Sequence, residues 1–207
     1  MSEQTALPCS DASERNKGPI LAILEDVLAE AAFAAGGLVL EIGSGTGQHA
    51  VHFAQHLAHL TWQPTDRSEW LDTLRERVRR EGTPNLRPPV ELDVNSPAWP
   101  IETADAIFSA NTLHIMAWHE VQAFFRGIGR TVARGGRVVV YGPFRFDGGY
   151  SSVSNAEFDA YLRRRDPASG IRDVEAVDVL AAAEGLELVA SHAMPANNQL
   201  LVWERAA

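Results

Sequence analysis

The chain has 207 residues, of which 45% are hydrophobic, and a formal net charge of −9. This length and composition fit one α/β domain with a hydrophobic core. The acidic balance argues against nucleic acid as the main partner, because proteins that bind phosphate backbones carry a basic excess or stripe. We interpret the two arginine-rich stretches, 75–80 and 163–165, as solvated helix faces. The single cysteine, Cys9, excludes an internal disulfide and a cysteine-based zinc site.

The chain shows no segment for membrane insertion or export. Its apolar stretches are broken well before the ~20 residues that a membrane helix needs. Residues 1–18 contain no apolar signal-peptide core. We therefore expect a cytoplasmic protein without a membrane partner. Residues 1–13 are expected to form a flexible lead-in, and residues 14–207 a single domain, because no linker or repeat interrupts them.

In chain order, the apolar spacing predicts strands that alternate with helices. Helical spacing covers residues 14–34, 47–59, 68–81, 118–132 and 174–184. Strand-like runs cover residues 38–42, 60–65, 88–92, 104–109, 138–141, 186–192 and 199–204. A turn is expected at 134–136, and segment 144–173 is interpreted as a long connection. This alternation indicates an α/β fold with a mostly parallel sheet, in which the last two strands, joined by a short turn, pair antiparallel.

Candidate ligand-binding residues directly follow the predicted strands, because open α/β sheets bind ligands beyond the carboxyl ends of their strands. Residues 41–47 read Glu-Ile-Gly-Ser-Gly-Thr-Gly between a strand and a helix. The glycines allow a tight turn and close approach of a ligand, and the helix N-terminus favours an anionic group such as a carboxylate. The GxGxG spacing differs from the GxGxxG of dinucleotide sites. Glu41 suits a ligand with an ammonium and a sulfonium better than one with a pyrophosphate.

Two aspartates end the next predicted strands. Asp66 can accept hydrogen bonds from both hydroxyls of a ribose, and its alternative role is the N-cap of the helix that begins at Ser68. Asp93 is placed to receive an adenine amino group, and its alternative role is to form a turn.

Residues 41–47, Asp66, Asp93, Asn111 and the pair Gly135-Gly136 resemble the motif series of class I S-adenosylmethionine-dependent methyltransferases. Residues 14–205 more narrowly resemble a small, largely uncharacterised methyltransferase-like family of bacteria and animals. The runs that carry this resemblance are 14–17, 45–50, 62–64, 113–115, 141–144, 154–156, 170–173 and 194–198. It implies a Rossmann-like, seven-stranded sheet with helices on both faces and S-adenosylmethionine as cofactor. The expected cofactor-binding residues are Glu41, Gly43, Ser44, Gly45, Gly47, His49, Asp66, Asp93, Val94 and Asn111.

For the acceptor side, the candidate catalytic residues are His114, Tyr141 and Arg172. His114 follows the fourth strand, where it is either a general base or a hydrogen-bonded structural histidine. Arg172 indicates an acidic group on the acceptor, or else an ion pair with Asp173 or a neighbour. Tyr141 lines the pocket or ends a strand in the core. Further candidates are Asn111, Phe144, Asn155, Asn197 and Asn198.

A small-molecule acceptor is expected. We expect its pocket to be built by the loop after the fifth strand, segment 150–173 and the hairpin at 194–198, because long connections near ligand edges are commonly functional. We also expect the polar run 14–17 and the helix after it to fold over the cofactor as a lid.

Four histidines, His49, His52, His56 and His59, share one side of a predicted helix. Metal sites use helical histidine pairs but add ligands from a second element. We therefore interpret these residues as the polar border of a packed helix and expect no metal.

Three functions fit the sequence. The first is methyl transfer to a small molecule. The second is a catalytically silent protein that binds the same cofactor and regulates or binds a partner. The third is an NAD-dependent oxidoreductase, which the loop spacing disfavours.

Overall fold

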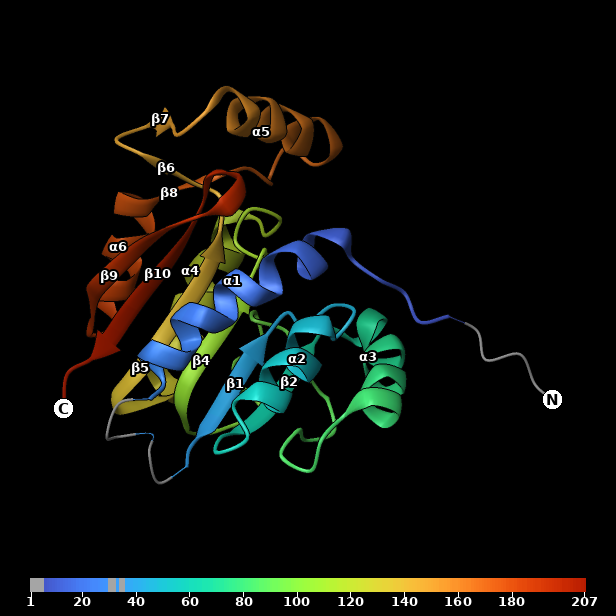
Figure 1. Cartoon of the computed structure of the whole chain (residues 1–207). Coiled ribbons are helices and arrows are strands. Elements are labelled where there is room, and N and C mark those ends of the chain that lie inside the picture. Colours follow the sequence, from blue (N-terminus) through green and yellow to red (C-terminus); the bar gives the residue numbers. More distant parts are fainter. Residues whose placement is uncertain (1–5, 30–32, 34–35) are drawn as a thin grey trace. The chain divides into compact units, whose positions relative to one another are not determined.

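The main sheet of the protein has seven strands in the order β3-β2-β1-β4-β5-β10-β9 (Figure 1). The computed structural model describes residues 6–29, 33 and 36–207. The strands are β1 (Leu38–Ile42), β2 (Thr61–Asp66), β3 (Val90–Glu91), β4 (Ala104–Ala110), β5 (Val132–Gly142), β9 (Leu186–Met194) and β10 (Asn198–Arg205). The pairs β1–β2, β2–β3 and β4–β5 are parallel, whereas β10 runs antiparallel to both β5 and β9. The fold class predicted from the sequence is confirmed, with helices flanking the sheet.

The chain divides into two compact units, Met1–Leu92 and Asp93–Ala207. The first contains β1 to β3 with helices α1 (Asp11–Val27), α2 (Gln48–His56) and α3 (Ser68–Glu81). Helices α2 and α3 pack against β2, and α1 packs against α2. Its core contains the fully buried side chains of Leu40, Phe53, Trp62 and Leu74. The bounds predicted for β1, β2 and α3 match those of the structure within one residue at each end.

The second unit contains β4, β5, β9 and β10 with helices α4 (Trp118–Thr131), α5 (Val153–Arg165) and α6 (Val174–Ala183). Helix α6 packs against both α4 and β9. The inner strands β4, β5 and β10 each contain a run of four or more consecutive buried residues. The buried side chains that build this core are Ile107, Phe108, Phe124, Phe125, Val138, Val139, Leu200, Leu201 and Trp203.

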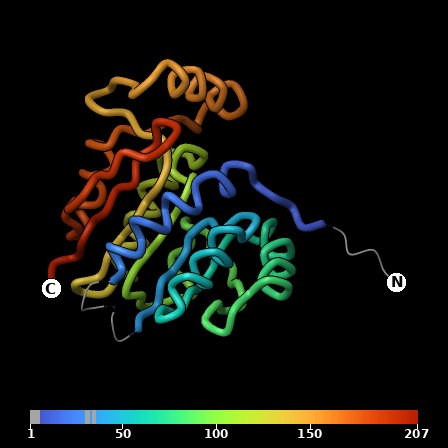
Figure 2. The backbone as a smooth tube through the Cα atoms, in the orientation of Figure 1, coloured from blue at the N-terminus to red at the C-terminus, as the bar shows by residue number. Residues whose placement is uncertain are grey.

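Segment 144–173 is more ordered than the long connection expected from the sequence. It holds β6 (Phe144–Phe146), β7 (Gly149–Tyr150), helix α5 and β8 (Arg172–Asp173), and the three strands form a second sheet in the order β7-β6-β8. The trace in Figure 2 follows this excursion from the end of β5 to the start of α6. Strands of two or three residues are too short to show an alternation of apolar and polar residues, so the sequence does not predict them. The β6–β8 pairing joins Phe144 to Arg172, at opposite ends of the segment.

Several element boundaries differ from the predictions. Helix α1 begins at Asp11, because the Ser10 side chain accepts a hydrogen bond from the Ser13 amide and caps the helix. It ends at Val27, earlier than expected; residues 30–32 and 34 of the predicted helix lie outside the described residues. The turn expected at 134–136 lies inside β5, where the pairing with β4 shifts register. A single 3-10 turn, Pro195–Asn197, joins β9 to β10. Within the described part of the chain, no helix is long and apolar enough to span a membrane.

Candidate functional site

A glycine loop follows β1 in the first unit. The Gly43 and Ser44 amides both donate to the Thr65 carbonyl oxygen, at 3.1 and 2.9 Å, and the Gly47 amide donates to the Ser44 carbonyl at 2.9 Å. These bonds reverse the chain directly after β1 and join the loop to the end of β2. Gly43, Gly45 and Gly47 have φ of 76°, 54° and 77°, in the left-handed region that glycine occupies without a steric penalty.

Two glycines of this loop face different surroundings. A Cβ on Gly47 would lie 2.7 Å from Leu74 Cδ1 and 3.1 Å from Arg77 Cδ, so this position has no room for a side chain. A Cβ on Gly45 would meet no atom within 4 Å. Gly47 therefore allows α3 to pack against the loop, whereas Gly45 leaves space beside the backbone for a ligand.

Asp66, the last residue of β2, binds the backbone of the glycine loop. Its Oδ2 accepts from the Gly45 amide at 2.6 Å, and its Oδ1 accepts from the Arg67 amide at 2.8 Å. Burial raises the pKa of the Asp66 carboxyl, although these two hydrogen bonds oppose the shift. The N-cap of α3 is Arg67, so the alternative in which Asp66 caps this helix is wrong.

Glu41, in β1, is a buried carboxyl group with 1% of its surface exposed. Its Oε2 accepts from the Trp62 indole nitrogen at 2.8 Å. Burial raises the pKa of Glu41 to about 7, against the hydrogen bonds from Trp62 and Ser44, and the charge of Asp66 raises it further. A positive group beside Glu41 would therefore ionise it, since an opposite charge stabilises the carboxylate.

The first turn of α2 contacts the N-terminal segment. His49, 6% exposed, lies with its Nε2 2.7 Å from Asn16 Oδ1 and stacks on Phe53. Burial lowers the pKa of His49 to about 4, so its imidazole is neutral at pH 7. Gln48 accepts from the Ser10 amide and donates to Glu14 Oε1, each at 2.5 Å.

Sequence reasoning missed Arg77, which stabilises the glycine loop although it lies in an arginine-rich stretch interpreted as solvated. Arg77 is 6% exposed. Its guanidinium donates to the carbonyl oxygens of Thr46 at 2.5 Å and Pro8 at 2.6 Å, and pairs with Glu81 at 2.7 Å. The available signal was its spacing from Leu74, because a residue three positions further along lies on the same helix face.

The other three histidines of the predicted set are half-buried or exposed. His56 Nδ1 lies 2.8 Å from the His52 carbonyl oxygen, and His59 lies beyond the end of α2. Among the described residues, no group of three or more His, Cys, Asp or Glu side chains is arranged to hold a metal ion.

In the second unit, Asp93 and Asn111 follow β3 and β4. Asp93 is exposed; its Oδ1 accepts from the Asn95 amide at 2.9 Å and its carbonyl from the Ser96 amide at 2.9 Å, so it forms the turn named as its alternative role. Asn111 has a φ of 59° and donates its amide to the Tyr141 carbonyl oxygen at 2.8 Å. Val94, between them in sequence, is buried.

His114 and Tyr141 are both buried in the second unit. The His114 ring lies edge-on to Phe158 at 5.5 Å, and its carbonyl oxygen accepts from the Gly170 amide at 2.9 Å. Burial, with a smaller effect from the charge of Arg172, lowers the pKa of His114 to about 4. Tyr141, one residue before the end of β5, pairs with Ala110 of β4 and Leu200 of β10.

Arg172 holds the loop after β4 in place. It donates to the carbonyl oxygens of Leu113 at 3.1 Å, Ala168 at 3.0 Å and also Met116. Asp173 instead pairs with Arg145 at 2.5 Å. The ion pair with Asp173 or a neighbour, expected as the alternative role of Arg172, is therefore not found among the described residues.

Segment 150–173 and the β9–β10 hairpin are in contact. The Asn155 side-chain amide donates to the Asn197 carbonyl oxygen at 2.9 Å, and the Asn197 amide group donates to Ser154 Oγ at 3.4 Å. Two of the three elements expected to build an acceptor pocket thus lie together.

Solved methyltransferase structures share the fold. An O-methyltransferase family protein from Burkholderia thailandensis superimposes with a TM-score of 0.79 at 16% identity, over 95% of this chain and 58% of that one. The S-adenosylmethionine-dependent methyltransferase SibL gives 0.76 at 20% identity, over 95% and 56%. The O-methyltransferase family 2 protein from Planctomyces limnophilus, in complex with apigenin, gives 0.73 at 16%, over 92% and 62%.

These identities show the fold alone, and the chain spans about three fifths of the length of the structures it matches. Over residues 7–205, the chain also matches a family that is described as "Protein of unknown function (DUF938)".

Proposed function

The chain belongs to this family of unknown function, DUF938, and we propose that it is an S-adenosylmethionine-dependent methyltransferase with a small-molecule acceptor. The observation that carries the proposal is the loop after β1, where Gly45 borders open space and its amide binds the buried carboxylate of Asp66. The S-adenosylmethionine-dependent methyltransferase among the similar structures supports this choice of cofactor.

The first unit offers groups that fit this cofactor. Gly43, Gly45 and Gly47 would hold its amino-acid end close to the backbone. Glu41 supplies a buried carboxyl with a pKa of about 7, which an ammonium group would ionise. Each Asp66 oxygen accepts one backbone hydrogen bond and keeps a lone pair for a ribose hydroxyl.

The remaining proposed contacts are less specific. Ser44 lies within the loop and His49 in the first turn of α2. In the second unit we propose the side chains of Asp93, Val94 and Asn111. Asp93 Oδ1 accepts from the Asn95 amide, and a carboxylate with two oxygens keeps acceptor capacity for an adenine amino group.

The bound cofactor would supply a methyl group already activated by its sulfonium, so the protein mainly positions the acceptor. His114 is neutral at pH 7, because its pKa is about 4. A base this weak is poorly matched to remove a proton at neutral pH. We therefore propose that His114 orients, rather than deprotonates, an acceptor atom that is already ionised or loses its proton readily. Tyr141 and Arg172 then act as walls and supports of the acceptor side.

We propose that the polar run 14–17, which lies within α1 and not ahead of it, acts together with the rest of α1 and residues 8–10 as a lid on the glycine loop. They contact the loop's own neighbours: Ser10 and Glu14 bind Gln48, and Asn16 binds His49. Both partners lie in the first turn of α2, directly after Gly47. Lids of this kind exclude water and complete a site.

The low pKa of His114 favours, as a second candidate, a protein that binds the cofactor without catalysis. Incubation of cell extract with methyl-labelled S-adenosylmethionine separates the two. Methyl transfer predicts label in a small-molecule product, reduced in Asp66→Ala and unchanged in Asp72→Ala, whose side chain is 99% exposed. Tight cofactor binding without any labelled product would support the silent protein instead.

A further inference from the structure

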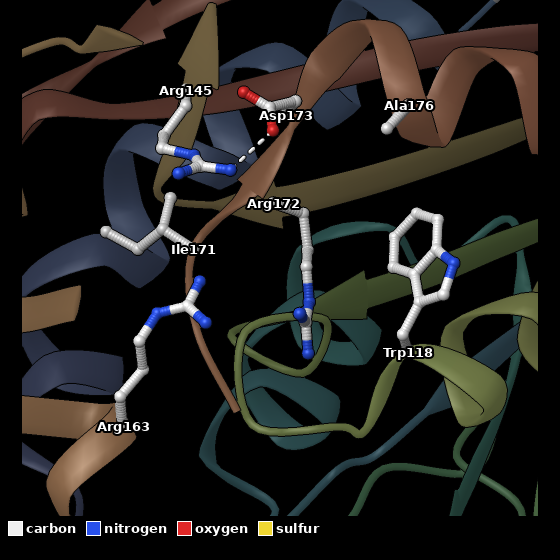
Figure 3. A pocket seen from close by; sticks show the side chains of 7 residues that line it. All are labelled: Trp118, Arg145, Arg163, Ile171, Arg172, Asp173 and Ala176. Carbon is white, nitrogen blue, oxygen red and sulfur yellow. Dashed lines mark hydrogen bonds and ion pairs between the residues drawn. The ribbon is translucent and has the colours of Figure 1, made fainter. Parts of the chain in front are cut away.

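The second unit contains a cavity of about 210 Å³ whose lining is dominated by arginine. Arg145 comes from β6, Arg163 from α5 and Arg172 from β8, and the cavity is completed by Trp118, Ile171 and Asp173. In Figure 3 the guanidinium groups of Arg145 and Arg163 flank Ile171, and Arg172 extends between Arg163 and Trp118. Three separate elements thus bring cations to one small space, in a protein whose net charge is −9.

Arg172 is a buried cation without a matching carboxylate. It is 9% exposed, and its hydrogen bonds go to the main-chain oxygens of the loop after β4 and of Ala168. Among the described residues, no carboxylate forms an ion pair with it. Burial and the charges of Arg163 and Arg145 lower its pKa, although the charge of Asp159 opposes this shift. A buried charge without a counter-ion is costly, and carbonyl dipoles only partly offset that cost.

The other two arginines of the cavity each have one carboxylate partner, so the charge of Arg172 stays unbalanced. Arg145 pairs with Asp173 at 2.5 Å, and Arg163 pairs with Asp159 at 2.7 Å. Three guanidinium groups therefore face two carboxylates. The buried Nε of Arg145 also has no hydrogen-bond partner within the part of the chain that the structure describes.

The backbone is shaped to admit Arg163. A Cβ on Gly170 would lie 2.6 Å from Arg163 Nη2 and 2.9 Å from Asp159 Oδ1. Gly170 has a φ of 149°, within the range that favours glycine. Asp159 holds the same region together, because its carboxylate accepts from Tyr150, Arg163 and the Ile171 amide. These bonds hold Arg163 and the backbone before Arg172 in a defined arrangement.

We propose that this cavity binds a small oxyanion, either a carboxylate or a phosphate group, between Arg145, Arg163 and Arg172. Guanidinium groups offer planar pairs of donors that match both kinds of oxyanion. The cavity also borders Ala176 in the first turn of α6, where the helix dipole adds positive potential. The inference concerns binding alone and does not depend on the proposed methyl transfer.

Oxyanion binding has a structural consequence. Arg172 fixes the carbonyl oxygens of Leu113 and Met116, in the loop that begins at Asn111. A counter-ion on Arg172 would stabilise this arrangement, and the bound protein would unfold at a higher temperature, since a ligand that binds only the folded state stabilises it.

The test is calorimetric titration of the full chain with inorganic phosphate and, separately, with succinate, at constant ionic strength set by sodium chloride. We expect saturable binding of one anion per chain, and the tighter of the two probes identifies the class. Arg163→Gln should weaken that binding at least tenfold. The matched control is Arg164→Gln, an exposed neighbour on α5 that does not line the cavity; it should bind like the parent.

A second variant guards against an effect on folding alone. Arg172→Lys keeps the charge and loses the planar donor pair, so it should bind more weakly while its thermal unfolding still shows a single folded state. Failure of both probes to saturate, or equal affinities in the parent and in a folded Arg163→Gln protein, would overturn the proposal. Methyl-transfer activity is measured separately. Because the titration measures anion binding alone, its result can be interpreted whether or not the protein transfers a methyl group.

Discussion

The glycine loop of the first unit and segment 144–173 of the second both follow a strand of the sheet, but different interactions build them. The loop is held by main-chain bonds between β1 and β2, with Gly43 and Ser44 donating to Thr65. The segment is held largely by charged side chains, around Asp159, Arg172 and Asp173. Substitution in the first region is limited mainly at its three left-handed glycines, whereas the second region depends on which charged side chains are present.

The largest effect is expected at Gly47, where the side chains of Leu74 and Arg77 leave no room for a Cβ. Gly47→Ala should lower the free energy of unfolding by roughly 4 kcal/mol, because left-handed strain adds to the clash with Leu74. Gly45→Ala adds left-handed backbone strain without a clash, so it should lower the free energy of unfolding by only about 1–2 kcal/mol. It should also weaken cofactor binding, because the methyl group fills space beside the loop. Chemical denaturation and calorimetry of both variants compare the two effects. Equal stability losses at the two positions would contradict the difference in packing.

Glu41 predicts a pH-dependent stability difference. Its pKa rises from 4.5 to about 7 on folding, so its stabilising contribution is fully present below pH 4.5 and is lost as the pH rises through 7. The loss is roughly 3 kcal/mol. Glu41→Gln should therefore gain stability relative to the parent between pH 4.5 and 8, as measured by denaturation at each pH. The exposed Glu157→Gln is the control, and a pH-independent difference for Glu41→Gln would exclude this cause.

Asp159 tests the side-chain network of the second region. Asp159→Ala removes the carboxylate that accepts hydrogen bonds from Tyr150, Arg163 and the Ile171 amide. It should lower the free energy of unfolding by roughly 2 kcal/mol. The loss should be local, with hydrogen exchange faster in 144–173 and unchanged in β1 and β2. The control, Asp166→Ala, removes one exposed turn bond to the Ala168 amide. Faster exchange throughout both units would show that the segment is not an independent region.

The smallest effect concerns the N-terminal contacts of the glycine loop. Deletion of residues 1–17 removes the bonds from Ser10, Glu14 and Asn16 to α2. Cofactor affinity should fall roughly tenfold, about 1.4 kcal/mol, while the sheet stays folded by circular dichroism. Deletion of residues 1–7, which keeps Pro8 and its bond to Arg77, is the control. Full affinity in the longer deletion would reject the lid.

Much of the first region could be predicted because its signals are local. The apolar run 38–42 and the three glycines that follow correspond to β1 and its loop. The carboxyl group of Asp66 lies beside that loop because parallel strands end at the same edge. What the spacing did not show is the environment of each group, such as the indole of Trp62 against Glu41.

The second region was harder to predict because its contacts join distant residues through side chains. Arg163 lies in a charged stretch typical of a solvated helix face, yet one side of it lines a cavity. Strand β8 has two residues and exists only by pairing with β6. The ionic partner of Asp173 is Arg145, 28 residues away, rather than its neighbour Arg172. No local pattern encodes such pairings.

Calorimetric titration of the purified chain with S-adenosylmethionine, S-adenosylhomocysteine and NAD tests the central claim most directly. We predict that both S-adenosyl compounds bind at one site per chain and that NAD gives no saturable heat. Asp66→Ala should bind them more weakly by about 1.5–3 kcal/mol, the range for hydrogen bonds to a charged group. Saturable binding of NAD, or unchanged affinity for S-adenosylhomocysteine in a folded Asp66→Ala protein, would contradict the account.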